Sequence, residues 1–179
     1  GAYPVAEKYI AVLENTFYYK DWAKAQRKFL YNDEAVETDP LLGNMRRNLL
    51  AENHLIQMDG FDTDLIRLAE QNPSNKAAFH YAGVFYLLAK DMTRFKTLVE
   101  TYYGTDLLPS LPVSFQEAVI ILSEKDPDYW KRFGVSESIV GRFTDYKRQV
   151  LAGRNNSNAL PGLMYRSYGD TYWYYYMFK

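Results

Sequence analysis

Apolar residues recur every three or four positions along most of this chain, and that spacing places them on one face of an α-helix. The first such face contains Val5, Tyr9, Leu13 and Phe17. The apolar residues of later faces are Trp22, Ala25 and Phe29; Leu42, Met45, Leu49 and Ile56; Leu65, Leu68 and Ala69; Ala78, Ala82, Phe85 and Ala89; Met92, Phe95, Val99 and Tyr102; and Ile139, Phe143, Tyr146 and Val150. The sequence nowhere sustains the alternation typical of a strand, so it predicts an all-α protein of roughly ten helices.

Helix starts are indicated by residues whose side chains accept hydrogen bonds from the first free backbone N–H groups. The residues in such positions are Asp21, Asp39, Ser74, Asp91, Asp126, Ser136 and Asp170. Ser114 and Glu117 have the spacing of a capping box before an apolar run. Residues 153–158 form the clearest loop.

Two segments of the chain resemble each other. They are "YYKDWAKAQRKFLYN" at residues 18–32 and "LAKDMTRFKTLVETY" at residues 88–102. In both, we expect one helix to end at a Lys-Asp pair and a basic amphipathic helix to follow. The two pairs are separated by two periods of about 35 residues, and a degenerate middle copy fits at residues 56–70.

This period is that of tetratricopeptide repeats, and residues 4–104 resemble a divergent member of that superfamily. Gly83 and Tyr86 match the small and aromatic positions of a first helix, and Ala25 and Phe29 match those of a second helix. Phe95 stands where the family has a small residue, which argues against regular superhelical stacking. The resemblance implies antiparallel helical hairpins stacked as a TPR-like α-α superhelix over residues 2–104. Residues 105–179 would then form a C-terminal helical extension and cap, continuous with the repeats.

The C-terminal part, from "LPVSFQEAVIILSEKDPDYWKRFGVS" to "YGDTYWYYYMFK", is similar to the end of an uncharacterised bacterial family. Members of that family have a multi-spanning membrane portion upstream, so the resemblance implies the soluble tail of a membrane-associated parent. The chain opens with Gly1 instead of methionine, which we interpret as a scar of tag removal.

Composition excludes several functional classes. The 21 basic and 22 acidic residues are mixed along the chain, which argues against a nucleic-acid surface. No apolar run reaches the roughly 20 residues that cross a bilayer, so we expect no direct membrane insertion. The absence of cysteine excludes disulfides and thiolate chemistry. It leaves the compartment open, with the periplasm slightly favoured over the cytoplasm.

The sequence shows no catalytic constellation. His54 and His80 lack the helical spacing that presents two metal ligands on one face. The acidic residues between 59 and 64 do not fit a calcium loop, and a helix N-terminus explains them. Glu124, Asp126 and Asp128 form the tightest acidic group, beside Tyr129 and Trp130, without indicating a sugar cleft. We therefore expect no enzyme activity, metal or cofactor in this chain, although the parent could be an enzyme.

Aromatic residues are in excess, with 17 Tyr, 10 Phe and 3 Trp. A tyrosine combines a large ring with a hydroxyl that needs a partner, so it suits both inter-helix packing and a binding groove. Packing is the better interpretation for most of them. The candidate binding residues are Tyr102 and Tyr103, beside Gly104, together with Tyr86 and His80.

The aromatic C-terminal segment is expected to be a short helix over residues 171–178, capped by Asp170. A helix that is apolar nearly all round is buried, so Trp173 and at least two neighbouring tyrosines should pack against the preceding helices. The segment would then cover the last open seam of the array.

The sequence thus favours a non-enzymatic protein-interaction or scaffolding module that binds a peptide, a protein or the membrane part of its own parent. The alternative is an accessory glycan-binding domain of a membrane-bound enzyme that acts on glycans or lipid-linked sugars. In that case aromatic rings would stack on sugar rings.

Overall fold

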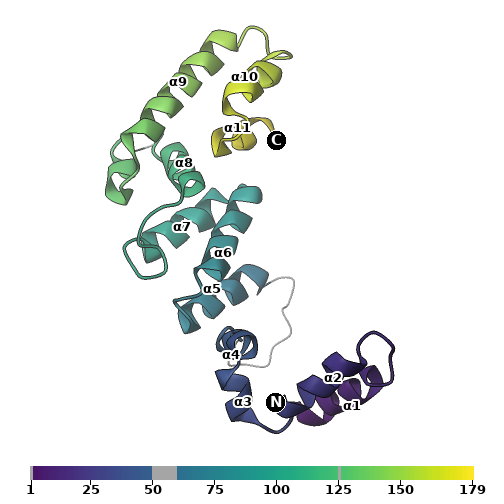
Figure 1. Cartoon of the computed structure of the whole chain (residues 1–179). Coiled ribbons are helices and arrows are strands. Elements are labelled where there is room, and N and C mark those ends of the chain that lie inside the picture. Colours follow the sequence, from purple (N-terminus) through teal and green to yellow (C-terminus); the bar gives the residue numbers. More distant parts are fainter. Residues whose placement is uncertain (1, 50–59, 125) are drawn as a thin grey trace. The chain divides into compact units, whose positions relative to one another are not determined.

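The computed structural model describes residues 2–49, 60–124 and 126–179, and these are helical with no strand. The predicted all-α class is confirmed (Figure 1). The chain divides into two compact units, Gly1–Asn53 (unit 1) and His54–Lys179 (unit 2). The sequence does not indicate this boundary, and the division expected at residues 104 and 105 stays a prediction.

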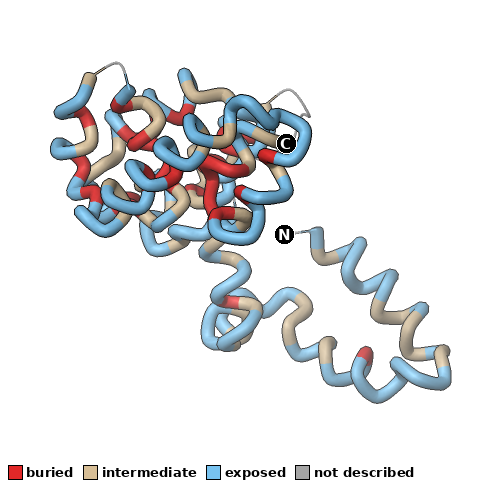
Figure 2. Tube along the Cα trace, turned by 90° about the horizontal axis from the view of Figure 1, so that it is seen from above, coloured by how far each residue is buried: buried red, intermediate tan, exposed pale blue. Residues whose placement is uncertain are grey.

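Unit 1 contains α1 (Tyr3–Leu13), α2 (Lys20–Gln26), a 3-10 turn η1 (Arg27–Phe29), α3 (Asp33–Thr38) and α4 (Pro40–Arg47). Helix α1 packs on α2, and α3 packs on α4. Among its described residues only Ala23 and Gly43 are buried. Figure 2 shows α1 and α2 as mostly exposed positions. The helices of this unit therefore lack a core of large side chains.

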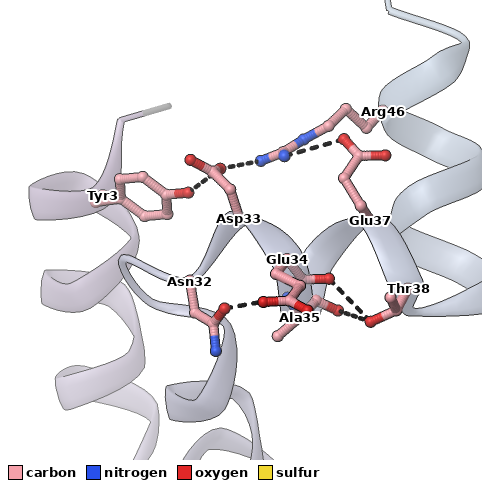
Figure 3. A network of polar contacts seen from close by, with 8 residues as sticks. All are labelled: Tyr3, Asn32, Asp33, Glu34, Ala35, Glu37, Thr38 and Arg46. Carbon is pink, nitrogen blue, oxygen red and sulfur yellow. Dashed lines mark hydrogen bonds and ion pairs between the residues drawn. The ribbon is translucent and has the colours of Figure 1, made fainter.

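Polar contacts connect the parts of unit 1 instead (Figure 3). The Tyr3 hydroxyl donates to Asp33, whose carboxylate also pairs with Arg46 at 2.8 Å. Arg46 reaches Glu37 at 3.1 Å as well. These neighbours raise the pKa of Arg46 above its ordinary value, with the hydrogen bond to Asp33 as the largest cause. Arg46 thus joins the start of α1 to α3 and α4.

Unit 2 contains α5 (Phe61–Gln71), α6 (Lys76–Leu88), α7 (Met92–Tyr102), α8 (Val113–Leu122), the 3-10 helix η3 (Tyr129–Phe133), α9 (Glu137–Gly153), α10 (Leu160–Tyr168) and α11 (Tyr172–Phe178). Consecutive helices pack from α5 to α9, and α10 packs on α9. Helix α11 returns to pack on α8 as well as on α10. The chain end is thereby placed against the middle of the unit (Figure 1).

The core of unit 2 is continuous and rich in aromatic residues. Its largest fully buried side chains are Trp173, Phe79, Phe95 and Phe115. Phe115 meets Phe95 edge to face, with ring centroids 5.1 Å apart. Phe115 also lies directly over Gly83 of α6, where an added Cβ would be 2.2 Å from the ring. The small residue at position 83 is therefore required by the approach of α8 to α6.

The two Lys-Asp pairs have different roles. At Lys90-Asp91 the expectation is correct, because α6 ends at Leu88 and Asp91 caps α7 by accepting from the Arg94 N–H at 2.9 Å. Lys90 has a φ of 55°, a left-handed backbone conformation that is common just after the end of a helix. At Lys20-Asp21 the expectation is wrong, since α1 ends at Leu13 and Lys20 is the first residue of α2.

The other predicted helix starts are partly right and partly wrong. Asp39 does cap α4, accepting from Leu41 and Leu42. Ser74 does not cap α6, which has Asn75 at that position. Ser114 cannot cap α8, because that helix begins one residue earlier, at Val113. The third predicted helix ends at Arg47, and its last apolar residue, Ile56, lies outside the described residues.

The predicted burial of the C-terminal segment is confirmed. Trp173, Tyr172 and Tyr174 are 1%, 8% and 6% exposed. The cap of α11 is Thr171 instead of Asp170, and its hydroxyl accepts from the Tyr174 N–H at 3.2 Å. Asp170 pairs with Arg142 of α9 at 2.7 Å. This ion pair draws the Asp170 carboxylate away from the end of the helix.

Candidate functional site

The four binding residues expected from the sequence do not form one site. Tyr86 and Tyr102 line a cavity of about 290 Å³ with Ile66 of α5 and a face of α7. Tyr103 packs against Phe133, with ring centroids 5.3 Å apart. His80 contacts the rings of Phe79 and Phe115. Neither Tyr103 nor His80 lines the cavity that Tyr86 and Tyr102 share.

The hydroxyls of Tyr86 and Tyr102 already have partners. Tyr86 donates to Asp62 at 2.7 Å, and Arg94 approaches the same carboxylate oxygen at 3.2 Å. The Tyr86 hydrogen bond is the main reason that the pKa of Asp62 is lowered. Tyr102 donates to Glu70, and burial with this bond raises the pKa of Tyr102 to about 12. Both tyrosines thus connect α5 to the α6–α7 hairpin.

His80 has the character of a partly buried helix residue. Burial lowers its imidazole pKa, and the charge of Lys76 one turn earlier adds to the effect. The other histidine, His54, lies outside the described residues. Within the described ranges no group of three His, Cys, Asp or Glu side chains is placed to hold a metal ion.

A more apolar cavity lies where α8, α9 and α11 meet. It has a volume of about 370 Å³ and is lined by Ile121, Glu124, Phe143, Tyr146, Lys147, Val150, Leu151, Trp173, Tyr176 and Met177. A second hollow of about 610 Å³ shares Ile121, Glu124 and Tyr176 with it and extends to Met92, Lys96 and Glu100 of α7. We call these two adjoining cavities the α8 groove.

The walls of the α8 groove follow from helical spacing. On α9, residues 143, 146, 147, 150 and 151 recur every three or four positions, so they share one face. On α11, residues 173, 176 and 177 do the same. The two faces converge over Ile121 at the end of α8.

Buried contacts fix the inner wall of the groove. The ring centroids of Phe143 and Tyr146 lie 5.0 and 5.9 Å from the ring centroid of Trp173. The Tyr146 hydroxyl donates to the Trp173 carbonyl at 3.2 Å. Burial raises the pKa of Tyr146 to about 12, so the hydroxyl keeps its proton at neutral pH. The wall is therefore formed before any ligand arrives.

The outer edge of the groove is exposed and apolar, with charges beside it. Leu151 is 62% exposed and Met177 is 51% exposed. The Lys147 ammonium lies 5.0 Å from the centre of the Phe143 ring, and Glu124 lines the same cavity. An apolar side chain could enter here, while a neighbouring backbone or charged group would meet Lys147 and Glu124.

Glu117 of α8 fixes the position of α11, which forms one wall of the groove. This carboxylate is buried and accepts from the Tyr172 N–H at 2.7 Å, while the Glu117 carbonyl accepts from the Trp173 indole at 2.8 Å. Burial raises the pKa of Glu117. The residue expected in a capping box thus satisfies the first N–H of a different helix, 55 residues along the chain.

Comparison with known proteins places the chain in a family. The model of a family described as "Family of unknown function (DUF6057)" matches residues 1–179. The chain belongs to this family. It has no significant match among the curated proteins or the solved structures.

In this DUF6057 chain, sequence reasoning missed the α8 groove. The apolar face of α9 and the burial of the C-terminal helix are both predictable from the sequence, but the sequence does not show that α11 packs on α8 and forms a cavity with α9. Among the described residues, no helix is both long and apolar enough to span a bilayer.

Proposed function

We propose that this chain is a non-enzymatic protein-interaction module whose α8 groove binds an extended peptide segment of a partner. The observation that supports it best is the apolar cavity of about 370 Å³ with exposed Leu151 and Met177 at its edge. Exposed apolar residues beside a cavity are typical of binding surfaces. The partner segment would place one or two apolar side chains in the cavity.

Preorganisation supports this proposal. Phe143, Tyr146 and Trp173 pack on one another, so little ordering of the groove would oppose binding. Lys147 and Glu124 flank the cavity and would favour a segment with charges of both signs. Met177 adds an adaptable side chain, which suits sequences of varied shape.

We also propose that residues 2–104, which include α5, α6 and α7, are a divergent TPR-like array. Its support is the packing of α6 on α7, together with Gly83 of α6, which admits the ring of Phe115 from α8. Such arrays present extended binding surfaces. The partner would then be another protein or the membrane part of a longer parent chain.

The groove variants Leu151→Glu and Met177→Glu test the proposal. Peptides that bind the full chain are first selected from a random display library. Their affinity for either variant should be about tenfold or more lower than for the unchanged chain, because the new carboxylate would have to be desolvated beside the apolar cavity. The control is Leu163→Glu on α10, where the leucine is 58% exposed but does not line the groove. Equal binding by all variants would contradict the proposal.

The glycan-binding alternative is less consistent with the geometry. A sugar stacks on an exposed ring face. Of the described rings that line the cavity of about 370 Å³, those of Phe143, Tyr146 and Trp173 are 7%, 4% and 1% exposed, and Tyr176 is 37% exposed. Most of the ring surface in the groove is therefore closed to a sugar. We expect a glycan array probed with the full chain to stay blank. Glycan signals that disappear in Leu151→Glu but persist in Leu163→Glu would favour the alternative instead.

A further inference from the structure

The turn between α1 and α2 exposes an unusual group of aromatic residues. Phe17, Tyr18, Tyr19 and Trp22, which we call the aromatic tip, are 92%, 87%, 57% and 55% exposed. Phe17 and Tyr18 touch edge to face, with ring centroids 5.2 Å apart. Four large aromatic side chains this exposed within six residues indicate an interaction surface.

The turn is held in shape by its own contacts. The Thr16 hydroxyl donates to the Leu13 carbonyl at 2.7 Å and accepts from the Tyr19 N–H at 3.2 Å. The Arg27 guanidinium donates to both carboxylate oxygens of Glu14, at 2.6 and 2.7 Å, and so joins the two ends of the segment that contains the turn. The aromatic tip is therefore presented on a structured turn between two helices.

Charge in unit 1 is polarised toward the aromatic tip. Residues 14–29 contain four basic side chains and two acidic ones: Lys20, Lys24, Arg27 and Lys28 against Glu14 and Asp21. Residues 30–49 have the opposite balance, with Arg46 and Arg47 against Asp33, Glu34, Glu37 and Asp39. With Arg27 paired to Glu14, Lys20, Lys24 and Lys28 still outnumber Asp21, so the segment that carries the exposed rings is basic and complements an anionic surface.

We propose that the aromatic tip adsorbs to the headgroup layer of an anionic lipid bilayer. Tyrosine and tryptophan suit this layer because their rings enter it while their polar groups stay in water. Exposed lysines beside them would contact lipid phosphates. A short turn reaches headgroup depth only, so adsorption differs from the membrane insertion that the sequence argues against.

The choice of a bilayer over an acidic protein follows from the composition of the tip. Tyr18, Tyr19 and Trp22 flank Lys20 and Asp21, so rings of the type enriched at membrane interfaces stand directly beside a lysine that can contact a lipid phosphate. The residues belong to unit 1 alone, so this inference stands or falls independently of the α8 groove.

Vesicle binding by the full chain tests this inference. We expect flotation with vesicles of equal parts phosphatidylcholine and phosphatidylglycerol, and little with phosphatidylcholine alone. The double variants Phe17→Ser/Tyr18→Ser and Lys20→Glu/Lys24→Glu should each bind at least about tenfold more weakly, because rings and basic charges both contribute at an anionic surface. The control is Tyr81→Ser/Tyr165→Ser, whose tyrosines are 68% and 62% exposed in unit 2.

Tryptophan fluorescence gives a second readout of the same binding. Trp22 is exposed and lies in unit 1, whereas Trp173 is buried and Trp130 half-buried, both in unit 2. A blue shift on adding the mixed vesicles should therefore disappear in Trp22→Phe. Failure of the wild-type chain to bind the mixed vesicles would overturn the proposal and leave the tip to a protein partner. Undiminished binding by Phe17→Ser/Tyr18→Ser would overturn it as well.

Discussion

Deleting residues 170–179 is expected to abolish the cooperative unfolding of unit 2. The deletion removes Thr171, Tyr172, Trp173 and Tyr174, all of them buried. It leaves the core face of α8 and α9 open to water, at a cost of about 2–3 kcal/mol for each large side chain lost from the core. For Tyr172, Trp173 and Tyr174 together the loss is about 6–9 kcal/mol. This is comparable with the whole stability of a small domain, about 5–15 kcal/mol, so we expect cooperative folding to fail.

The deletion also removes the polar contacts that α11 makes with α6. The hydroxyls of Tyr172 and Tyr175 donate to the carbonyls of Leu87 and Leu88 at 3.0 and 2.7 Å. These carbonyls belong to the last turn of α6, where the regular helical donors run out; the Leu87 carbonyl accepts from the Lys90 N–H at 3.1 Å as well. The tyrosine hydroxyls of α11 thus donate hydrogen bonds to carbonyls at the end of a distant helix, which is one physical reason for the tyrosine-rich C-terminal segment.

Circular dichroism and dye binding measure the effect of the deletion. The truncated chain should retain helical signal but lose its sharp melting transition and bind an apolar dye. As a graded comparison, Trp173→Ala should cost about 3–5 kcal/mol, whereas Met177→Ala, at an exposed edge, should cost about 1 kcal/mol or less. An unchanged melting transition after truncation would show that α11 does not close the core.

Gly83→Ala should destabilise the protein, although alanine is the better helix former. In an exposed helix interior this change stabilises by about 1 kcal/mol. At position 83 the new Cβ would lie 2.2 Å from the ring of Phe115, which is itself fully buried. The Phe115 ring is packed in the core and has little room to shift away, so we expect a net loss of about 2 kcal/mol.

Two further variants isolate the clash as the cause. Gly141→Ala on α9 is the matched control, because an added Cβ there meets nothing within 4 Å, and it should be neutral or stabilising. Phe115→Leu is destabilising by itself, but Gly83→Ala should cost less in that background. Chemical denaturation of the four chains of this double-mutant cycle measures the coupling. Additive losses would mean that Gly83 and Phe115 do not constrain each other.

Some helix starts are predictable from single residues, whereas those expected at Ser74, Ser114 and Asp170 are not capped by these residues. Asp39 and Asp91 each precede an apolar-periodic stretch, and both cap the helix that follows. The buried α11 was predictable because its residues are apolar nearly all round. Glu117 was misassigned because its partner, the Tyr172 N–H, is 55 residues away and competes with any local capping role.

The candidate site was less predictable than the fold. The sequence offers Tyr86 as a binding residue, yet its side chain is buried and its hydroxyl donates to Asp62. The α8 groove depends on α9 and α11 converging at the end of α8, and periodicity shows only that each helix has an apolar face. Leu151 and Met177 are exposed because they lie near the ends of α9 and α11. The spacing of apolar residues does not predict where these helices end.

The proposed binding function is tested most directly by methionine methyl spectra of the full chain with a selected peptide. Met177 and Met92 line the α8 groove, whereas Met164 is buried in the core and Met45 lies in unit 1. We predict that the peptide shifts the Met177 signal most, with a smaller change at Met92 and none at Met45 or Met164. A bound peptide that shifts Met45 and leaves Met177 unchanged would contradict the assignment of the groove.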